Sequence, residues 1–323
     1  MRESIMSQAS DLAFTREGLY GTTVEATFAG ATSFMRRRYS RDLNGVDVAI
    51  TGVPYDLATS NRSGARMGPR AVRAISSTLS WGTVMGWGFD PFDNLAAVDY
   101  GDCTFDSGRP EQIPDEIYHH AKSILDQGTA MLMLGGDHFS TYPVIKAHAE
   151  KHGPISLIHF DAHSDTWEDE DGRIDHGTMF YHAAKQGIVD PEHSAQVGMR
   201  LFNPNNHGFN VYTAEWVHEE GIEKTVAAIR QAVGDRPCYV SFDIDCLDPS
   251  YAPGTGTPVV GGLSSHQALK IIRGLAGINV VGMDVVEVAP AYDVSEITAL
   301  AAATIGLDLL CLYAYKHCSP QKG

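Results

Sequence analysis

Short apolar runs alternate with amphipathic stretches along most of the chain. The apolar runs have the length of buried β-strands, and the stretches between them place apolar residues at the spacing of a helix that buries one face. Strands that are apolar on both faces and alternate with helices are typical of a parallel sheet covered on both sides. The pattern therefore predicts an α/β fold with helix layers on both faces of one sheet.

The bounds of these elements follow from the pattern and from local start and stop signals. The predicted strands are Val46–Pro54, Leu95–Asp102, Ala130–Leu134, Ile155–Phe160, Ser194–Met199, Cys238–Asp243 and Val280–Val288. The predicted helices are Gly68–Leu79, Ile113–Gln127, Thr141–Lys151, Glu223–Val233, Ser264–Leu275 and Ser295–Lys316. Pro69 suits a first helical turn, Gly128 a helix end and Ser264 an N-cap.

No repeat, low-complexity tract or Pro- and Gly-rich linker divides the chain. Residues 41–323 are therefore expected to form a single domain. Residues 1–40 are less regular and rich in arginine, which predicts an N-terminal arm that packs on the domain or on a neighbouring subunit. The most apolar stretch, Ile297–Tyr315, includes Asp308 and is expected to be a buried core helix rather than a membrane span.

Charge and cysteine content narrow the possible partners. The net charge is −16, from 24 Lys and Arg against 40 Asp and Glu, so nucleic acid is not an expected partner and a small cationic molecule is compatible. The 5 cysteines form no CxxC pair, which favours free thiols in a reducing compartment. Since the N-terminus lacks the apolar run of a signal peptide, we expect a cytoplasmic protein without membrane contact.

Acidic residues and histidines follow three of the predicted strands. Ala130–Leu134 leads to His138, Ile155–Phe160 leads to Asp161, His163 and Asp165, and a third strand ends in Asp243 and Asp245. The carboxyl ends of parallel strands meet at one edge of a sheet. If the strand conformation continues, the side chains of Asp161, His163 and Asp165 point to the same side.

Four carboxylates and two imidazoles at one edge would repel each other or stay poorly solvated unless cations join them. Helix caps and solvated loop residues are the ordinary alternative for a single Asp-X-Asp motif, but three such segments in one chain favour metal binding. Six oxygen and nitrogen donors without sulfur suit Mn²⁺ best. A pair of such ions lowers the pKa of a shared water toward neutrality, which provides a nucleophile.

Two further residues complete a candidate active site. His176 follows the ligand cluster and would shuttle protons to a leaving amine, although a structural histidine is the simpler interpretation outside a metal site. Glu287 is the acidic residue at the end of an apolar strand, where it needs a partner. A substrate guanidinium would fit it bidentately, and an internal arginine is the alternative.

These segments resemble the signature sequences of the ureohydrolases, the family that includes arginase and agmatinase. The resemblance rests on Gly135–His138, Asp161–Asp165 and Ser241–Pro249, and it extends to Thr51–Asp56, Ala252–Pro258 and Met283–Pro290. It covers nearly the whole chain from about Gly45 onward. Within the family, Asp175–Phe180 and Asp293–Thr298 most resemble the bacterial agmatinases.

The resemblance implies a three-layer α/β/α sandwich around a parallel sheet of about eight strands, and a homotrimer or homohexamer. It implies two Mn²⁺ ions per subunit, with Asp161 and Asp243 shared between them. The first ion would also be bound by His138 and Asp165, and the second by His163 and Asp245. It further implies that Asp165 orients the attacking water, that Glu287 and His176 bind substrate and act in catalysis, and that agmatine yields urea and putrescine.

Other functions stay open on sequence alone. Guanidinobutyrate or guanidinopropionate would present a carboxylate tail, for which Arg200, Asn203 and Asn205 are candidate partners. The acidic segment Trp167–Ile174 favours the ammonium tail of agmatine instead. A one-metal amidohydrolase of the deacetylase kind and a non-catalytic metal-binding homologue are less compatible with six ligands beside His176 and Glu287.

Overall fold

One parallel sheet organises the molecule. The computed structural model describes residues 14, 18–21, 26–169 and 171–317. The sheet order is β1-β3-β2-β4-β9-β8-β5-β6-β7, and every pairing is parallel. The strands are β1 (Arg38–Tyr39), β2 (Val48–Val53), β3 (Ala97–Asp102), β4 (Ala130–Gly135), β5 (Ser156–Phe160), β6 (Ala195–Met199), β7 (Asn210–Thr213), β8 (Cys238–Asp243) and β9 (Val280–Val286).

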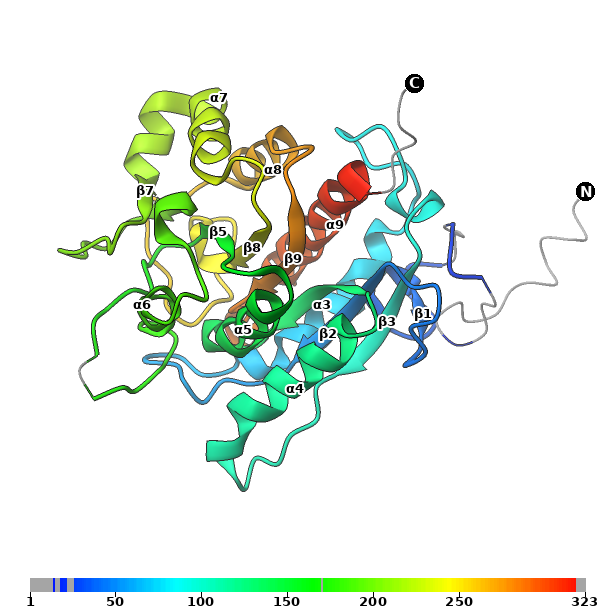
Figure 1. The fold of residues 1–323 in the computed structure, drawn as a ribbon. Helices are drawn as coiled ribbons and strands as arrows, with labels where there is room; N and C mark the ends of the chain where they lie inside the picture. The colour runs from blue at the N-terminus through cyan, green and yellow to red at the C-terminus, as the bar shows by residue number, and fades with distance from the viewer. Residues whose placement is uncertain (1–13, 15–17, 22–25, 170, 318–323) are drawn as a thin grey trace, which may run out of the picture.

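Helices cover both faces of this sheet (Figure 1). One layer consists of α4 (Ile113–Leu125), α5 (Thr141–His152) and α6 (Met179–Lys185). The other consists of α3 (Gly68–Ser76), α7 (Ala214–Val233), α8 (Ser265–Gly274) and α9 (Ile297–His317). The structure is therefore the predicted three-layer α/β/α sandwich.

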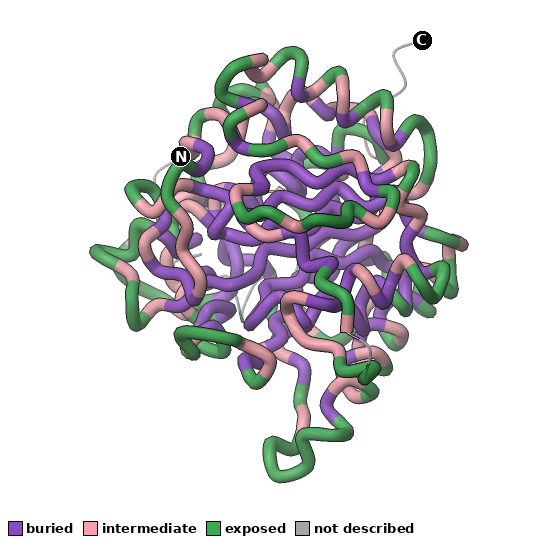
Figure 2. Tube along the Cα trace, turned by 90° about the vertical axis from the view of Figure 1, so that its left-hand side faces the viewer, coloured by how far each residue is buried: buried purple, intermediate pink, exposed green. Residues whose placement is uncertain are grey.

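Each face of the sheet has its own apolar core, because successive strand residues point to opposite sides. In β4, Leu132 packs with the α7, α8 and α9 side, whereas Met131 and Met133 pack with the α4 and α5 side. Figure 2 shows the buried strands crossing the middle of the molecule, with exposed residues along the outer helices and loops. The near-continuous apolar runs in the sequence reflect burial on both faces.

The predicted elements are present, and several local signals are confirmed. Pro69 lies in the first turn of α3, and Ser264 caps α8 in a capping box with Gln267. Helix α9 is long and apolar enough to cross a membrane, yet 72% of its apolar window is buried within the domain. The prediction of a buried core helix is confirmed.

Four features were not predicted. The two-residue strand β1 pairs with β3 at the sheet edge, and the short β7 and α6 gave no clear pattern. Helix α7 begins nine residues before the predicted Glu223, because Gly221 has a φ of +81° and joins two helical pieces across a kink. Of the predicted N-terminal arm, residues 1–40, the segment from Phe34 to Tyr39 packs on the domain, whereas residues 1–13, 15–17 and 22–25 lie outside the described part of the chain.

Candidate active site

Four adjacent strands, β4, β9, β8 and β5, bring the predicted site residues to one edge of the sheet. The segment after β4 threads between its neighbours: the Gly136 amide donates to Val53, and its carbonyl accepts from the amide of Glu287. A Cβ at Gly136 would overlap the Tyr55 backbone, so only glycine permits this close approach. This path fixes His138 beside the ends of β8 and β9.

The expectation of a continued strand after β5 is wrong in detail. β5 ends at Phe160, and Asp165 has a φ of +50°, in the left-handed region. The side chains of Asp161, His163 and Asp165 nevertheless face the same cluster, because the chain turns instead of running straight. Left-handed backbone at a non-glycine residue costs energy and is enriched at functional sites.

His138 forms the centre of a first group of ligands. Its Nδ1 lies 3.0 Å from Asp161 Oδ2, 2.9 Å from Asp165 Oδ2 and 3.3 Å from Asp243 Oδ2. This buried nitrogen makes no well-directed hydrogen bond to any described residue. Close contact without a hydrogen bond is the arrangement expected where a cation takes the place of a proton.

The other ring nitrogen of His138 fixes its tautomer. Ser241 Oγ donates to Asp284 Oδ1 at 2.7 Å, so its hydroxyl proton is already used. Ser241 must therefore accept from His138 Nε2–H, at 2.8 Å. The Nδ1 lone pair of a neutral His138 then points at the three carboxylates, a contact that a bound cation would make favourable.

His163 forms the centre of a second group. Its Nδ1 lies 3.2 Å from Asp161 Oδ1 and 3.1 Å from Asp245 Oδ2. Asp161 thus presents one oxygen to each group. Asp243 contributes Oδ2 to the first group and uses Oδ1 to accept the Asp245 amide at 2.8 Å. The six predicted ligands therefore lie together as two groups that share Asp161.

The electrostatics show how much this cluster needs positive charge. Burial, together with Asp245 and Asp161, raises the pKa of Asp243 well above its usual value. Burial alone would lower the pKa of His163, but Asp245 and Asp161 raise it to about 12. No lysine or arginine forms an ion pair with the four cluster aspartates within the part of the chain described. The donor set fits divalent cations.

Glu287 and His176 lie beside the first group. Glu287 Oε1 accepts the His138 amide at 2.8 Å and lies 3.3 Å from His176 Nδ1. Its Oε2 is buried without a hydrogen-bond partner among the described residues. Glu287 has a φ of +63°, so its carboxylate is held in place by a second strained backbone position.

His176 lies between Glu287 and the loop that carries Ser60. The Ser60 amide donates to His176 Nε2 at 3.0 Å, and Ser60 Oγ lies 2.8 Å from the same nitrogen. Burial would lower the pKa of His176, but Glu287 raises it to about 9 in the metal-free protein. The backbone amide and the hydroxyl of Ser60 therefore both contact the same ring nitrogen of His176.

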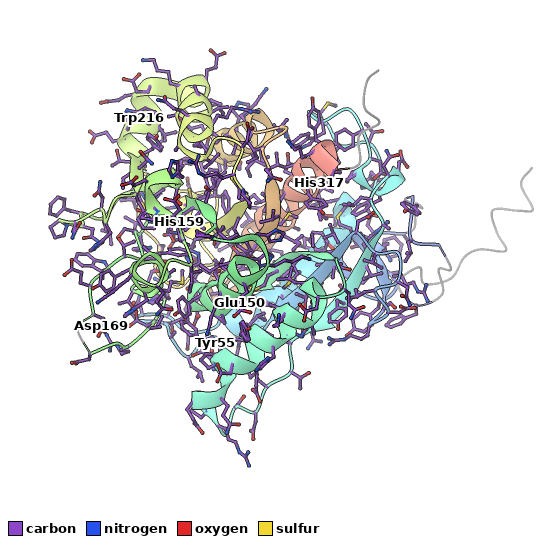
Figure 3. The ribbon with its side chains drawn as sticks, viewed as in Figure 1. Tyr55, Glu150, His159, Asp169, Trp216 and His317 are labelled. Carbon is purple, nitrogen blue, oxygen red and sulfur yellow. The ribbon has the colours of Figure 1, made fainter. Side chains whose placement is uncertain are left out.

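Sequence reasoning assigned no role to His159, Asp137 or Ser60 in this region. His159 lies within the first group, with Nε2 2.8 Å from Asp161 Oδ2. Figure 3 places it inside the molecule, whereas Asp169 of the acidic segment lies at the periphery. Asp137 accepts the Ala58 amide and so anchors the loop that bears Ser60. The alternation of His159, Asp161 and His163 was the available signal for the first of them.

The arginine and asparagine side chains near the cluster already form hydrogen bonds or ion pairs within the protein. Arg200 donates to the backbone carbonyls of Gly198, Asp245, Cys246 and Val259. Arg173 pairs with Asp169 and Asp175, each at 3.3 Å. Asn203 Nδ2 donates to Ser164 and Thr166. Of the three side chains considered as partners for a carboxylate tail, Arg200 and Asn203 are thus hydrogen-bonded within the protein, and Asn205 donates to Glu168 at 3.1 Å.

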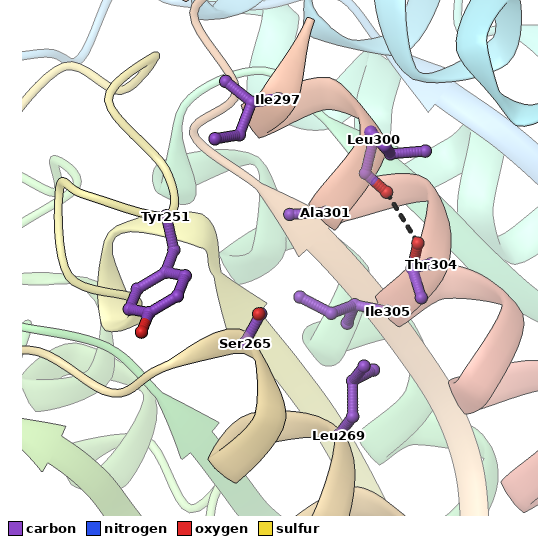
Figure 4. A pocket seen from close by; sticks show the side chains of 8 residues that line it. All are labelled: Tyr251, Ser265, Leu269, Ile297, Leu300, Ala301, Thr304 and Ile305. Atoms are coloured by element: carbon purple, nitrogen blue, oxygen red, sulfur yellow. Dashed lines mark hydrogen bonds between the residues drawn. The ribbon is translucent and has the colours of Figure 1, made fainter. Parts of the chain in front are cut away.

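A separate apolar pocket of about 260 Å³ lies between α8, α9 and the loop bearing Tyr251 (Figure 4). Its polar groups are few: Thr304 Oγ1 is bonded to the Leu300 carbonyl at 2.8 Å, and Ser265 faces it from α8. It offers neither carboxylate nor imidazole to a substrate. The cluster at the strand ends remains the candidate active site.

A buried group of imidazoles and carboxylates at the carboxyl edge of a parallel sheet is typical of metal-dependent hydrolases. The Arginase family model matches residues 46–311. The chain therefore belongs to the arginase family, whose members are metal-dependent, and it is a ureohydrolase that acts on C–N bonds.

Its relatives include an agmatinase from Chromobacterium violaceum, 59% identical over 308 residues, which are 95% of this chain and 96% of the relative. A solved hypothetical agmatinase from Burkholderia thailandensis has a TM-score of 0.93 at 59% identity, covering 94% of this chain and 98% of that one. Proclavaminate amidinohydrolase from Streptomyces clavuligerus has a TM-score of 0.86 at 41% identity, covering 91% and 100%.

Proposed function

We propose that this ureohydrolase hydrolyses agmatine to urea and putrescine, with two Mn²⁺ ions per subunit. His138, Asp161, Asp165 and Asp243 would hold one ion, and Asp161, His163, Asp243 and Asp245 the other. The supporting observation is the cluster itself: two ligand groups share Asp161 beside a buried Glu287 whose Oε2 has no hydrogen-bond partner among the described residues.

Glu287 would bind the guanidinium through Oε2, the atom left without a partner. Gly256 lies next to this oxygen, where an added Cβ would come within 3.5 Å of it, so the absent side chain keeps the approach open. A guanidinium there would replace a missing hydrogen bond with charge-assisted ones. The guanidinium carbon would then face the ligand groups around His138.

The bound metals would supply nucleophilic water near neutral pH. Asp165, whose Oδ2 lies 2.9 Å from His138 Nδ1, would orient that water toward the guanidinium carbon. His176, held protonated beside Glu287, would deliver a proton to the departing amine. The water oxygen would add to the guanidinium carbon first. The C–N bond to the alkyl amine would then break as the C=O bond of urea forms and the amine takes up the proton, so that agmatine gives urea and putrescine.

The preference for a substrate with an ammonium tail follows from the hydrogen bonds and ion pairs that nearby arginine and asparagine side chains already make. A carboxylate-tailed substrate such as guanidinobutyrate would need a free positive or donor group, but Nη1 and Nη2 of Arg200 donate to backbone carbonyls, Asn203 donates to Ser164, and Arg173 pairs with Asp169. Glu168 presents a carboxylate on the same side, where it accepts from Asn205 at 3.1 Å. An ammonium tail therefore suits the site better, and the 59% identity to an agmatinase supports the same choice.

Side-by-side urea-release assays test the proposal. With Mn²⁺ present, we expect kcat/KM for agmatine to exceed that for guanidinobutyrate by at least about 100-fold, as for sites built around a charged substrate group. Glu287→Gln should lower both values by a similar factor, because both substrates carry the same guanidinium. Faster hydrolysis of guanidinobutyrate by the wild type would contradict the assignment.

Two further expectations belong to this proposal. The four described cysteines, Cys103, Cys238, Cys246 and Cys311, are buried free thiols, which supports a cytoplasmic location. We also propose a homotrimer or homohexamer, as in the wider family, with residues 1–40 as an arm and residues 41–323 as the domain. Light scattering coupled to size-exclusion chromatography measures the number of subunits in the oligomer directly.

A further inference from the structure

His159 has no role in the proposed ligand set, yet it touches the residue at its centre. It lies in β5, is completely buried, and precedes Asp161 by two positions. Its Nε2 is 2.8 Å from Asp161 Oδ2, the same oxygen that lies 3.0 Å from His138 Nδ1. The other oxygen of Asp161 faces His163 at 3.2 Å. His159 thus contacts the carboxylate that both ligand groups share.

Gln196 determines how His159 presents its proton. It lies opposite His159 on the neighbouring strand β6. Its Nε2 is 2.6 Å from the Ser164 carbonyl, which can only accept, and 3.1 Å from His159 Nδ1. The amide therefore donates to both, and His159 Nδ1 accepts. A neutral His159 then carries its proton on Nε2, directed at Asp161.

Packing fixes the ring in this orientation. The His159 ring lies edge to face against Phe180, with centroids 4.6 Å apart, and 5.1 Å from the His138 ring. Rotation of the ring would break the bonds to Gln196 and Asp161 together. A buried, doubly bonded imidazole beside a shared ligand is the arrangement by which proteins orient metal-binding carboxylates.

We propose that His159 is a positioning residue: it donates a hydrogen bond from Nε2 to Asp161 Oδ2 and holds this carboxylate in the orientation that both cation positions require. The inference rests on the proposed function, since it assumes that Asp161 binds two ions. It assigns His159 an effect on metal binding through Asp161, without direct contact between its ring and the metal.

Two substitutions distinguish a role of His159 as a hydrogen-bond donor from a role that only fills space. The amide nitrogen of His159→Gln can occupy the place of Nε2, whereas that of His159→Asn can reach only the place of Nδ1. Equilibrium titration of the metal-free full-length variants with Mn²⁺ measures the dissociation constants. We expect His159→Asn to bind Mn²⁺ about 10- to 100-fold more weakly than the wild type, and His159→Gln to stay within about 3-fold.

Thermal unfolding of the metal-free variants provides the second readout. A merely structural role for His159 would lower the stability of both variants and leave no difference in their Mn²⁺ affinity. Gln196→Met keeps His159 but removes the donor to its Nδ1, and is expected to weaken Mn²⁺ binding by about 3- to 10-fold. This third variant keeps the proposal testable if a His159 variant does not fold.

The outcomes distinguish this inference from the function on which it rests. Equal Mn²⁺ affinity of His159→Asn and the wild type would overturn the inference and leave the proposed function intact. Loss of one bound Mn²⁺ per subunit in both His159 variants would also overturn it, because His159 would then be a ligand. A wild-type protein that binds no Mn²⁺ would refute the proposed function itself, and the inference with it.

Discussion

Two sets of buried aspartates in the same sheet are stabilised in different ways. Asp99 in β3 receives a bidentate ion pair from Arg73, at 2.8 and 3.1 Å, and also accepts the amide of Phe34. The cluster aspartates, such as Asp161 and Asp243, have no lysine or arginine ion pair among the described residues. Their neighbours are imidazoles, one another and a few neutral donors, such as the backbone amides of His163 and Asp245.

This difference separates structural charge from functional charge. Asp99 carries its own counterion and thereby joins β3 to α3 and to the segment before β1. Asp308 is likewise paired with an arginine, since its Oδ1 lies 2.6 Å from Arg273 Nε. The cluster instead concentrates carboxylates that repel each other, an arrangement that costs stability until cations bind. A buried carboxylate without an arginine is therefore the better indicator of a site.

Removing a cluster carboxylate should produce the largest effect on activity. Asp243→Asn is expected to lower kcat/KM for agmatine by more than about 10³-fold, beyond the loss of a single stabilising donor, because Asp243 is a charged ligand of both ions in the proposed function. Stability of the metal-free protein should stay the same or rise, because repulsion from Asp245 and Asp161 is relieved.

Urea-release assays and denaturant unfolding of the metal-free protein measure the two effects of Asp243→Asn. Asp235→Asn, at an exposed position, is the matched control and should match the wild type in both. Retained activity in Asp243→Asn, or a large loss of metal-free stability, would remove the distinction between the two sets of aspartates.

The structural aspartate should behave in the opposite way. Asp99→Asn leaves the buried Arg73 without its partner and is expected to cost about 3–5 kcal/mol in the free energy of unfolding. Asp102 also pairs with Arg73, but its side chain is 46% exposed, so Asp102→Asn should cost no more than about 1 kcal/mol. Urea denaturation compares the two variants, and equal losses would contradict this ranking.

Metal removal should have a smaller effect on stability. Treatment with a chelator is expected to destabilise the wild type by about 3 kcal/mol relative to a sample with Mn²⁺ at about 10 times the dissociation constant of each site, because each of the two ions then contributes about 1.4 kcal/mol. Asp243→Asn should show little of this difference. Calorimetric unfolding with and without Mn²⁺ measures it, and an identical melting temperature in the two wild-type samples would count against a resident metal.

The smallest expected effect is the pH dependence of stability that comes from His148, a buried histidine away from the cluster carboxylates. Burial lowers the pKa of His148 to about 4. Its unfolded form binds a proton near pH 6.5, so the stabilising contribution of the neutral ring is present above that pH and is lost as the pH falls toward 4. The metal-free wild type should lose about 1 kcal/mol per pH unit more than His148→Gln in this window. Parallel curves of unfolding free energy against pH would contradict the shift.

Much of the fold was predictable from the sequence, because burial on both faces makes parallel strands read as apolar runs. Strand β1 was not predictable, since its two residues form a strand only by pairing with β3. The first half of α7 was not predictable either, because the non-helical backbone at Gly221 interrupts the apolar spacing of the helix. Such features depend on contacts or on backbone geometry that no local pattern records.

In the site, contiguous motifs such as Asp161, His163 and Asp165 were accessible to sequence reasoning. His159 was overlooked because a histidine inside an apolar strand resembles a core residue. The left-handed backbone at Asp165 and Glu287 has no sequence signal at these residue types. Arg200 was considered for substrate binding, but only the structure reveals that its guanidinium is bonded to backbone carbonyls.

The most direct measurement is the number of Mn²⁺ ions that the wild-type subunit retains at equilibrium, determined by elemental analysis after dialysis against buffered Mn²⁺. Two ligand groups that share Asp161 predict two ions per subunit, with urea release from agmatine rising as the second ion binds. A single bound ion in a fully active protein, or activity without any, would contradict the account.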